Sequence, residues 1–184
     1  MAVPGVETLA GVCLAPTLTG FWKSEYGVSY AYGTAMLATG SLILRSSPAS
    51  PMAACQAAII AAYGLRLNLF LLWRELTIPR FREFREKIED RAKERGSRLS
   101  RAPFVLSCSA LYLGMAGPMV LTSSAPALGP LAPFLVAVMF SGFFVAAWGD
   151  FTKSFVKAKK GSEALVTSGP FAALRHPNCE SYVL

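Results

Sequence analysis

Charged residues are scarce in this chain. Of its 184 residues, 16% are Asp, Glu, Lys or Arg, whereas a soluble domain carries about 25%. The hydrophobic share is 53% and the mean hydropathy is +0.43. So little charge argues against a soluble nucleic-acid module, and so much apolar character argues against a disordered chain. The composition indicates a membrane protein.

The chain also lacks the patterns of a metal or disulfide site. It has one histidine, and its four cysteines stand far apart, without a CxxC pair or a histidine at zinc-binding spacing. Cys55 and Cys108 lie in apolar stretches, where we expect small buried thiols. We predict no metal site and no disulfide framework.

Long apolar stretches are what the chain does contain, at 26–44, 51–73, 102–122 and 130–149. Each approaches the roughly 20 residues that a helix needs to cross a hydrocarbon core of about 30 Å. Helices are the only open-chain structures that satisfy their own backbone in lipid. We predict an all-α polytopic integral membrane protein, a single membrane domain over 1–184 with four transmembrane helices.

The first twenty residues differ from a signal peptide. They include Pro4, Glu7 and Pro16, and they lack a basic start and a long apolar stretch. We expect an extended or surface-lying arm, with any organelle-targeting peptide absent or already removed.

The distribution of basic residues predicts an orientation. The 18 basic residues outnumber the 11 acidic ones, for a formal net charge of +7. With four spans, one side of the membrane holds Lys23, Arg74, the basic run 80–101, Lys153, Lys157, Lys159, Lys160 and Arg175. The positive-inside rule then places both termini on the cytosolic or stromal side, in the endoplasmic reticulum or an organelle membrane. Membrane lipids are expected partners, and nucleic acid is not.

The connector 77–101 is the one strongly hydrophilic segment. Pro79 suits a first helical turn and Gly96 a stop, so we predict a helix over about 79–95. Phe81, Phe84, Ile88 and Ala92 form a narrow apolar stripe, and pairs such as Glu89–Lys93 have a favourable i,i+4 spacing. Two readings remain: an amphipathic helix at the lipid headgroup level, or a solvated loop helix.

Arg66 is the single charge inside an apolar stretch. A central arginine costs about 2.5–3.5 kcal/mol on insertion scales, so it either faces the interior or extends to the interface. Arg74 lies eight residues away, about 12 Å along a helix. The alternatives are an internal site, with Asn68 or an acid at a helix end as partner, and a snorkelling anchor.

A second polar group follows the last apolar stretch. Asp150 and Lys153 come first, and Arg175-His176-Pro177-Asn178 follows after a short polar passage. A lone histidine is more often structural than catalytic. Here, however, arginine, histidine and asparagine sit together near several lysines, and such a group can hold a phosphate through charge-assisted hydrogen bonds.

These residues resemble a known family. Arg175-His176-Pro177-Asn178 resembles the start of the R-H-P-N-Y-x-G-E motif of membrane reductases related to steroid 5-alpha-reductase. A shorter form, R-H-P-x-Y, occurs in the distantly related isoprenylcysteine carboxyl methyltransferases. Asp150 and Lys153, with Gly169-Pro170-Phe171, resemble the D-x-x-K…G-x-F approach to that motif. Tyr63-Gly64-Leu65-Arg66-Leu67 resembles the W-x-x-R-L run of the uncharacterised reductase-like branch.

The resemblance, which covers about 55–178, implies a helical bundle that binds NADPH near its inner surface and reduces an apolar enone. It implies that the cofactor contacts are Asp150, Lys153, Arg175, His176 and Asn178, with Arg66 in the polar interior; it assigns no catalytic residue. The chain departs from the motif at Cys179, Ser181 and Tyr182, where the family has Tyr, Gly and Glu, and it stops at Leu184, before the family's further helices.

Two hypotheses follow. In the first, the chain is a C-terminally truncated NADPH-dependent oxidoreductase of a sterol, isoprenoid or other lipid enone, and the gene continues past Leu184. In the second, it is a non-catalytic accessory subunit of a larger membrane complex, for example a photosynthetic or respiratory one. Methyl transfer from S-adenosylmethionine fits less well, because Asp150 and Lys153 match the reductase branch. Small residues from Gly27 to Gly40 allow close helix contact, with a partner or inside the bundle.

Overall fold

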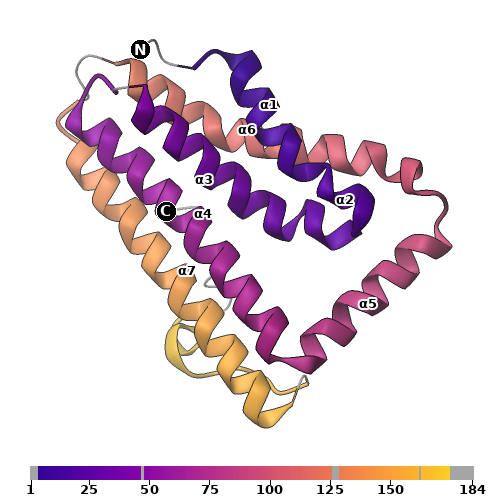
Figure 1. Ribbon diagram of the computed structural model, residues 1–184. Helices are drawn as coiled ribbons and strands as arrows, with labels where there is room; N and C mark the ends of the chain where they lie inside the picture. Colours follow the sequence, from indigo (N-terminus) through magenta and orange to yellow (C-terminus); the bar gives the residue numbers. More distant parts are fainter. Residues whose placement is uncertain (1–3, 47, 126–128, 162, 175–184) are drawn as a thin grey trace. The chain divides into compact units, whose positions relative to one another are not determined.

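The computed structural model describes residues 4–46, 48–125, 129–161 and 163–174, and all regular structure in them is helical (Figure 1). The all-α prediction is therefore confirmed for the described residues. Three helical segments are long and apolar enough to cross a membrane: Pro51–Thr77, Arg98–Ser124 and Ala132–Lys160. The first of the four predicted spans, 26–44, contains α3 (Ser29–Arg45), whose 17 residues are at the short end of what a span needs. Four spans are thus not confirmed.

Residue contacts group the chain into two compact units, Met1–Leu128 and Gly129–Leu184. We call them the N-terminal unit and the C-terminal unit and describe each by itself. The N-terminal unit contains the helices up to α6, and the C-terminal unit contains α7 and a short turn, η3. A single membrane domain over the whole chain stays a prediction.

Proline and glycine mark the ends of the helices. Helix α4 (Pro51–Thr77) has proline at its first position, and the Ser50 hydroxyl caps it by accepting a 3.1 Å hydrogen bond from the Ala53 N–H. Helix α5 (Pro79–Glu94) also begins at proline and stops before Gly96, whose φ of +132° few other residues adopt. Both ends agree with the signals in the sequence.

Glycines allow helices α3 and α4 to lie side by side (Figure 1). A Cβ atom on Gly64 of α4 would overlap the Gly33 carbonyl oxygen and would lie 2.5 Å from the Leu37 nitrogen. One helical turn later, the Asn68 amide is hydrogen-bonded to the Thr34 hydroxyl at 2.9 Å. The small residues of the first apolar stretch therefore pack inside the N-terminal unit, which was one of the two expected uses.

The N-terminal residues do not form the expected extended or surface-lying arm. Residues Val6–Thr17 form helix α1, which packs on α3 and on α6 (Ala102–Ser124). Leu9, Cys13 and Thr17 are at most 2% exposed. Their spacing of four residues places them on one helical face, and burial of that face outweighs the two prolines that suggested an arm.

Of the two cysteines that we expected to be buried, one is buried and the other is exposed. Cys108 is buried beside Tyr112 in the core of the N-terminal unit, as expected. Cys55 is exposed on α4, so the expectation of a buried thiol was wrong there. An apolar stretch does not show which of its faces the other helices cover.

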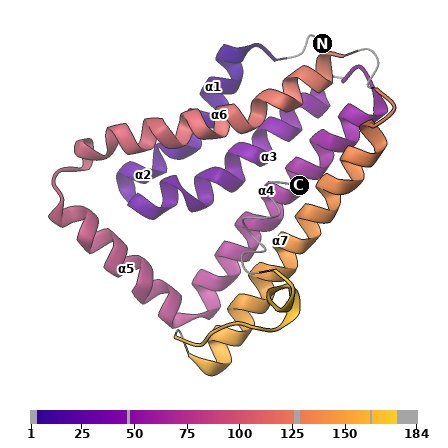
Figure 2. The same cartoon turned by 180° about the vertical axis from the view of Figure 1, so that it is seen from behind.

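A compact elbow precedes α3, and α5 returns the chain toward it. The elbow consists of α2 (Thr19–Trp22) and a 3-10 turn, η1 (Ser24–Gly27). Helix α5 leaves the end of α4, and a second 3-10 turn, η2 (Arg98–Arg101), leads into α6 (Figure 2). Both α5 and η2 contact the elbow, so the connector meets a segment that is far from it in the sequence.

Candidate functional site

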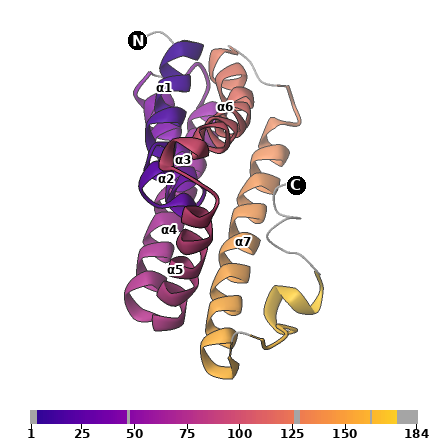
Figure 3. The same cartoon turned by 90° about the vertical axis from the view of Figure 1, so that its right-hand side faces the viewer.

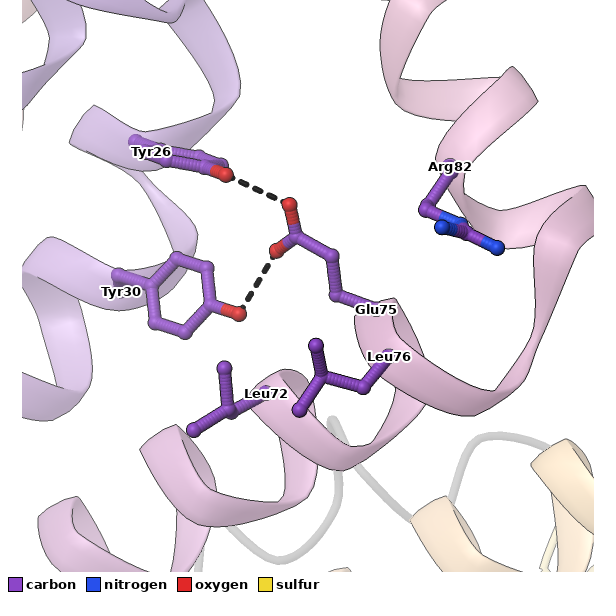
Figure 4. Close-up of a pocket in the computed structure, with 6 residues that line it drawn as sticks. All are labelled: Tyr26, Tyr30, Leu72, Glu75, Leu76 and Arg82. Atoms are coloured by element: carbon purple, nitrogen blue, oxygen red, sulfur yellow. Dashed lines mark hydrogen bonds between the residues drawn. The ribbon is translucent and has the colours of Figure 1, made fainter.

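Glu75, near the end of α4, is the centre of a polar cluster in the N-terminal unit. The Tyr26 hydroxyl donates a 2.6 Å hydrogen bond to its Oε1, and the Tyr30 hydroxyl donates a 2.8 Å bond to its Oε2 (Figure 4). Arg85 Nη1 lies 2.8 Å from the same Oε2 and forms an ion pair with it. Elements η1, α3, α4 and α5 each contribute one of these four side chains.

The guanidinium of Arg85 is buried among aromatic rings. Its side chain is 5% exposed, and its central carbon lies 5.0, 4.9 and 4.7 Å from the ring centroids of Tyr26, Tyr30 and Phe81. Its Nε also lies 3.3 Å from Oε2 of Glu25. Ring faces attract the cation and the carboxylates neutralise it, as a buried charge requires.

Glu25 is the less well solvated partner of Arg85. Burial raises the pKa of its carboxyl above the ordinary value, and the positive charges of Arg85 and Arg74 offset this only in part. One buried guanidinium thus forms ion pairs with two carboxylates. Removing it would leave both acids without their shared counter-ion.

An open pocket of about 490 Å³ adjoins this cluster. Figure 4 shows the Glu75 carboxylate turned toward the two tyrosines, with two leucines of α4 on one side and an arginine of α5 on the other. The lining residues are Tyr26, Tyr30, Leu72, Glu75, Leu76 and Arg82.

A second ion pair lies within the connector, between α5 and η2, and both of its side chains form hydrogen bonds with the backbone of the elbow. Arg101 binds Glu89 through two nitrogens, Nη2 to Oε1 at 2.9 Å and Nη1 to Oε2 at 3.2 Å. The Ser24 N–H donates a 2.9 Å hydrogen bond to the same carboxylate, and Arg101 Nη1 also donates to the Gly20 carbonyl at 3.4 Å. Arg101 is 7% exposed, so this planar, two-pronged pair is largely removed from water.

These two pairs give α5 contacts that the sequence did not suggest. The sequence left two readings, an amphipathic helix at the lipid headgroup level or a solvated loop helix. The buried residue of α5 is Arg85, and Phe84 of the stripe is 54% exposed, so both readings stay predictions. Glu89 pairs with Arg101 rather than with Lys93 as predicted, and Lys93 pairs with Asp90 at 3.1 Å. Helix α5 is therefore attached to the rest of the N-terminal unit by ion pairs and charge-assisted hydrogen bonds.

The Glu89 contact should make the connector sensitive to acid. Burial by itself raises the pKa of the Glu89 carboxyl, but the hydrogen bonds from Arg101 and the Ser24 N–H outweigh it, so the net pKa lies below the ordinary 4.5. A lowered folded-state pKa contributes stability that is complete above about pH 4.5 and is lost as the pH falls through the folded-state value. We expect hydrogen-exchange protection of residues 79–101, corrected for the intrinsic rate, to fall in that acid range.

Two variants test the assignment to Glu89. Glu89→Gln should show reduced protection of the connector already at neutral pH, and its profile should be flatter in acid. Glu86→Gln, an exposed position on the same helix, is the matched control and should keep the wild-type profile. A wild-type acid profile in Glu89→Gln would contradict the assignment.

The C-terminal unit contains two of the predicted cofactor residues, both on α7 (Ala132–Lys160). Asp150 is half-buried and Lys153 is exposed. The turn η3 (Gly169–Ala172) folds back onto this helix (Figure 3). Gly169 has a φ of +62°, and a Cβ atom on it would lie 2.9 Å from Oγ1 of Thr152, between the two predicted residues. The structure thus brings the Gly-Pro-Phe segment against the Asp-x-x-Lys turn.

The other predicted cofactor residues lie either in the N-terminal unit or outside the part of the chain that the structure describes. Arg175, His176 and Asn178 lie outside the described residues. Arg66 lies on α4 in the N-terminal unit, where it is half-buried and its guanidinium carbon is 6.0 Å from the Tyr63 ring centroid and 5.5 Å from that of Phe70. A stacked arginine of this kind fits a polar interior position and also fits an anchor that extends along its helix.

The residues of the cluster around Glu75 were not among those predicted from the sequence to form a site. Its signal was weak but present, because Tyr26 and Tyr30 have helical i,i+4 spacing and Glu75 is an acid at the end of an apolar stretch. Arg85 had no distinguishing signal, since Arg82 of the same helix also stands between a phenylalanine and a glutamate. In the described part of the chain, no group of three or more potential metal ligands comes together.

The fold and its three long apolar helices indicate a helical membrane protein. A family model described as "protein of unknown function (DUF1295)" matches residues 21–182. The chain belongs to this family, which is related to the steroid 5-alpha-reductase-like proteins. No curated protein and no solved structure matches the chain.

Proposed function

We propose that this chain is a reductase-like membrane protein whose C-terminal unit binds NADPH. The contact between Gly169 and Thr152 is the observation that supports the proposal most directly. It holds the segment that precedes Arg175 against the helix turn that bears Asp150 and Lys153, as far as Leu174, whose N–H donates a 2.9 Å hydrogen bond to the Pro170 carbonyl. The family relation supports it as well.

The predicted site residues of α7 suit a phosphorylated cofactor. Lys153 is an exposed ammonium on α7 and can bind a phosphate, and the half-buried Asp150 can accept hydrogen bonds from a sugar or amide. Arg175, His176 and Asn178 would be further hydrogen-bond donors to the phosphates. NADPH, when bound, would supply the hydride for a lipid enone. The chain's own residues would hold the dinucleotide at the membrane surface.

The proposal includes a topology of four spans with both termini on the cytosolic or stromal side, in the endoplasmic reticulum or an organelle membrane. Helix α3 is about 26 Å long at 1.5 Å per residue, which is close to the thickness of a hydrocarbon core. The basic residues at the end of α7 (Lys157, Lys159 and Lys160) support this orientation.

NADPH binding by the purified chain, with its C-terminus established by intact mass, tests the proposal. Lys153→Ala and Arg175→Ala should each weaken binding about tenfold, because each removes one charge-assisted contact to phosphate. Gly169→Ala should also weaken it, since the added Cβ moves the turn away from Thr152. Fluorescence of the bound dinucleotide gives the affinity.

Lys160→Ala is the matched control for charge, because Lys160 is an exposed lysine in the last turn of the same helix. It should bind NADPH with nearly wild-type affinity. No binding by the wild-type chain would overturn the proposal, and so would equal losses in Lys153→Ala and Lys160→Ala, which would indicate attraction by net charge alone.

A second candidate is a non-catalytic subunit of a larger membrane complex. The observation in its favour is an aromatic stripe along α7, at least 50% exposed at each position: Phe140, Phe144, Trp148, Phe151 and Phe155. The same purification distinguishes the candidates. After mild solubilisation, a subunit would migrate with stoichiometric partners on a native gel and would bind no NADPH.

A further inference from the structure

The pocket beside Glu75 has one apolar wall that is open to its surroundings. Leu72 and Leu76, one helical turn apart on α4, are 46% and 68% exposed. The tyrosine side chains that bind Glu75 lie across from them (Figure 4). Two exposed leucines in a pocket next to hydrogen-bonded polar groups suit a ligand with an apolar part and a polar head.

The remaining charge at the pocket is positive. Both carboxylate oxygens of Glu75 already accept tyrosine hydroxyls, and Arg85 neutralises the carboxylate. Arg82 is exposed on α5 and forms no ion pair with any residue of the described chain. Among the lining residues, only its guanidinium is left to attract a ligand charge, and that charge is negative.

The position of the pocket indicates where such a ligand comes from. Leu72 and Leu76 belong to a helix long and apolar enough to cross a membrane, close to its end at Thr77. Arg82 follows in the charged connector helix. A site at the junction of an apolar span and a basic segment lies at the level of lipid phosphates.

We propose that this pocket binds one anionic phospholipid of the surrounding bilayer, with its phosphate on Arg82 and the start of an acyl chain against Leu72 and Leu76. Arginine suits this role because its planar guanidinium donates two parallel hydrogen bonds to phosphate oxygens. A volume of about 490 Å³ holds a head group and the first part of a chain, and the rest of the lipid remains in the bilayer. The site does not depend on the proposed NADPH binding.

Native mass spectrometry of the full chain, titrated with phosphatidylglycerol or phosphatidylcholine of identical acyl chains, tests the proposal. The wild-type chain should retain one phosphatidylglycerol in preference to phosphatidylcholine. Arg82→Gln should reduce the affinity for phosphatidylglycerol about tenfold and abolish the preference. Leu76→Trp should reduce retention of both lipids, because the larger side chain fills the apolar part of the pocket.

Arg80→Gln is the control, because Arg80 is exposed on the same helix, carries the same charge and does not line the pocket. It should retain phosphatidylglycerol as the wild type does. Equal losses in Arg82→Gln and Arg80→Gln would overturn the proposal, as would preferential retention of phosphatidylcholine, a fatty acid or a sterol. NADPH binding is measured on the same variants and should not change, so failure of this site is distinguishable from failure of the cofactor site.

Discussion

Arg85→Ala is expected to destabilise the N-terminal unit by about 3–5 kcal/mol, the cost of removing one partner of a buried ion pair. The substitution would leave the carboxylates of Glu75 and Glu25 without the guanidinium they share, at 2.8 and 3.3 Å. It would also remove a cation that contacts three aromatic rings. Equilibrium unfolding in detergent micelles, followed by circular dichroism, measures the change in free energy.

Two further variants show whether the loss comes from this site. Arg91→Ala removes the same side chain at an exposed position of the same helix and should change stability by less than about 0.5 kcal/mol. Arg85→Lys keeps the charge but lacks the planar fork, so it should recover only part of the stability. If Arg85→Ala were no more destabilising than Arg91→Ala, the cluster would not hold α5 in place.

Gly64→Ala should also be strongly destabilising, by about 3 kcal/mol. Its Cβ would overlap the Gly33 carbonyl oxygen and lie 2.5 Å from the Leu37 nitrogen, and both are backbone atoms that move only if α3 and α4 separate. Inserting one methyl group into a packed contact costs about 1–3 kcal/mol, and a backbone contact belongs at the upper end. The same unfolding measurement applies.

Gly114→Ala is the matched control for this prediction. Gly114 lies in the middle of α6, and a Cβ atom there would have open space around it. Alanine favours a helix over glycine by about 0.5–1 kcal/mol, so this variant should be neutral or slightly stabilised. If both glycine variants had the same stability, the close approach of α3 and α4 would have no energetic consequence.

Charge plays an unusual part in attaching the connector helix. A buried ion pair seldom adds more stability than a well-packed apolar contact of the same size, but it permits few alternative partners. Arg85 pairs with Glu25 and Glu75. Arg101 pairs with Glu89 and donates a hydrogen bond to the Gly20 carbonyl. We infer that these pairs select one position for α5 at the elbow, which an apolar stripe alone would leave less well defined.

Local signals in the sequence predicted several elements correctly. Helices begin at Pro51 and Pro79 and end near Gly96 because proline and glycine act on the backbone at their own positions. The apolar stretches after 51, 102 and 130 became the three helices able to cross a membrane, because hydrophobic transfer depends on local composition.

The polar cluster could not be predicted in the same way. Glu75 and Arg85 are ten residues apart, Tyr26 and Glu75 are 49 apart, and Ser24 and Glu89 are 65 apart. In the sequence, Arg85 and Arg82 both stand between a phenylalanine and a glutamate, yet Arg85 is buried among rings and Arg82 is exposed. The prediction of a surface-lying arm failed for a related reason, because the face of α1 is buried only when α3 and α6 lie beside it.

By itself, the sequence determined the helical class, three helices that can cross a membrane, the ends of the connector helix and the family. These properties follow from backbone preferences and from hydrophobicity summed over neighbouring residues. Only the tertiary structure decided which charges are buried, which cysteine is exposed, and where a pocket lies. Burial of a charge is stable only when partners from distant segments surround it, so its energy belongs to the folded arrangement and not to any one stretch of the chain.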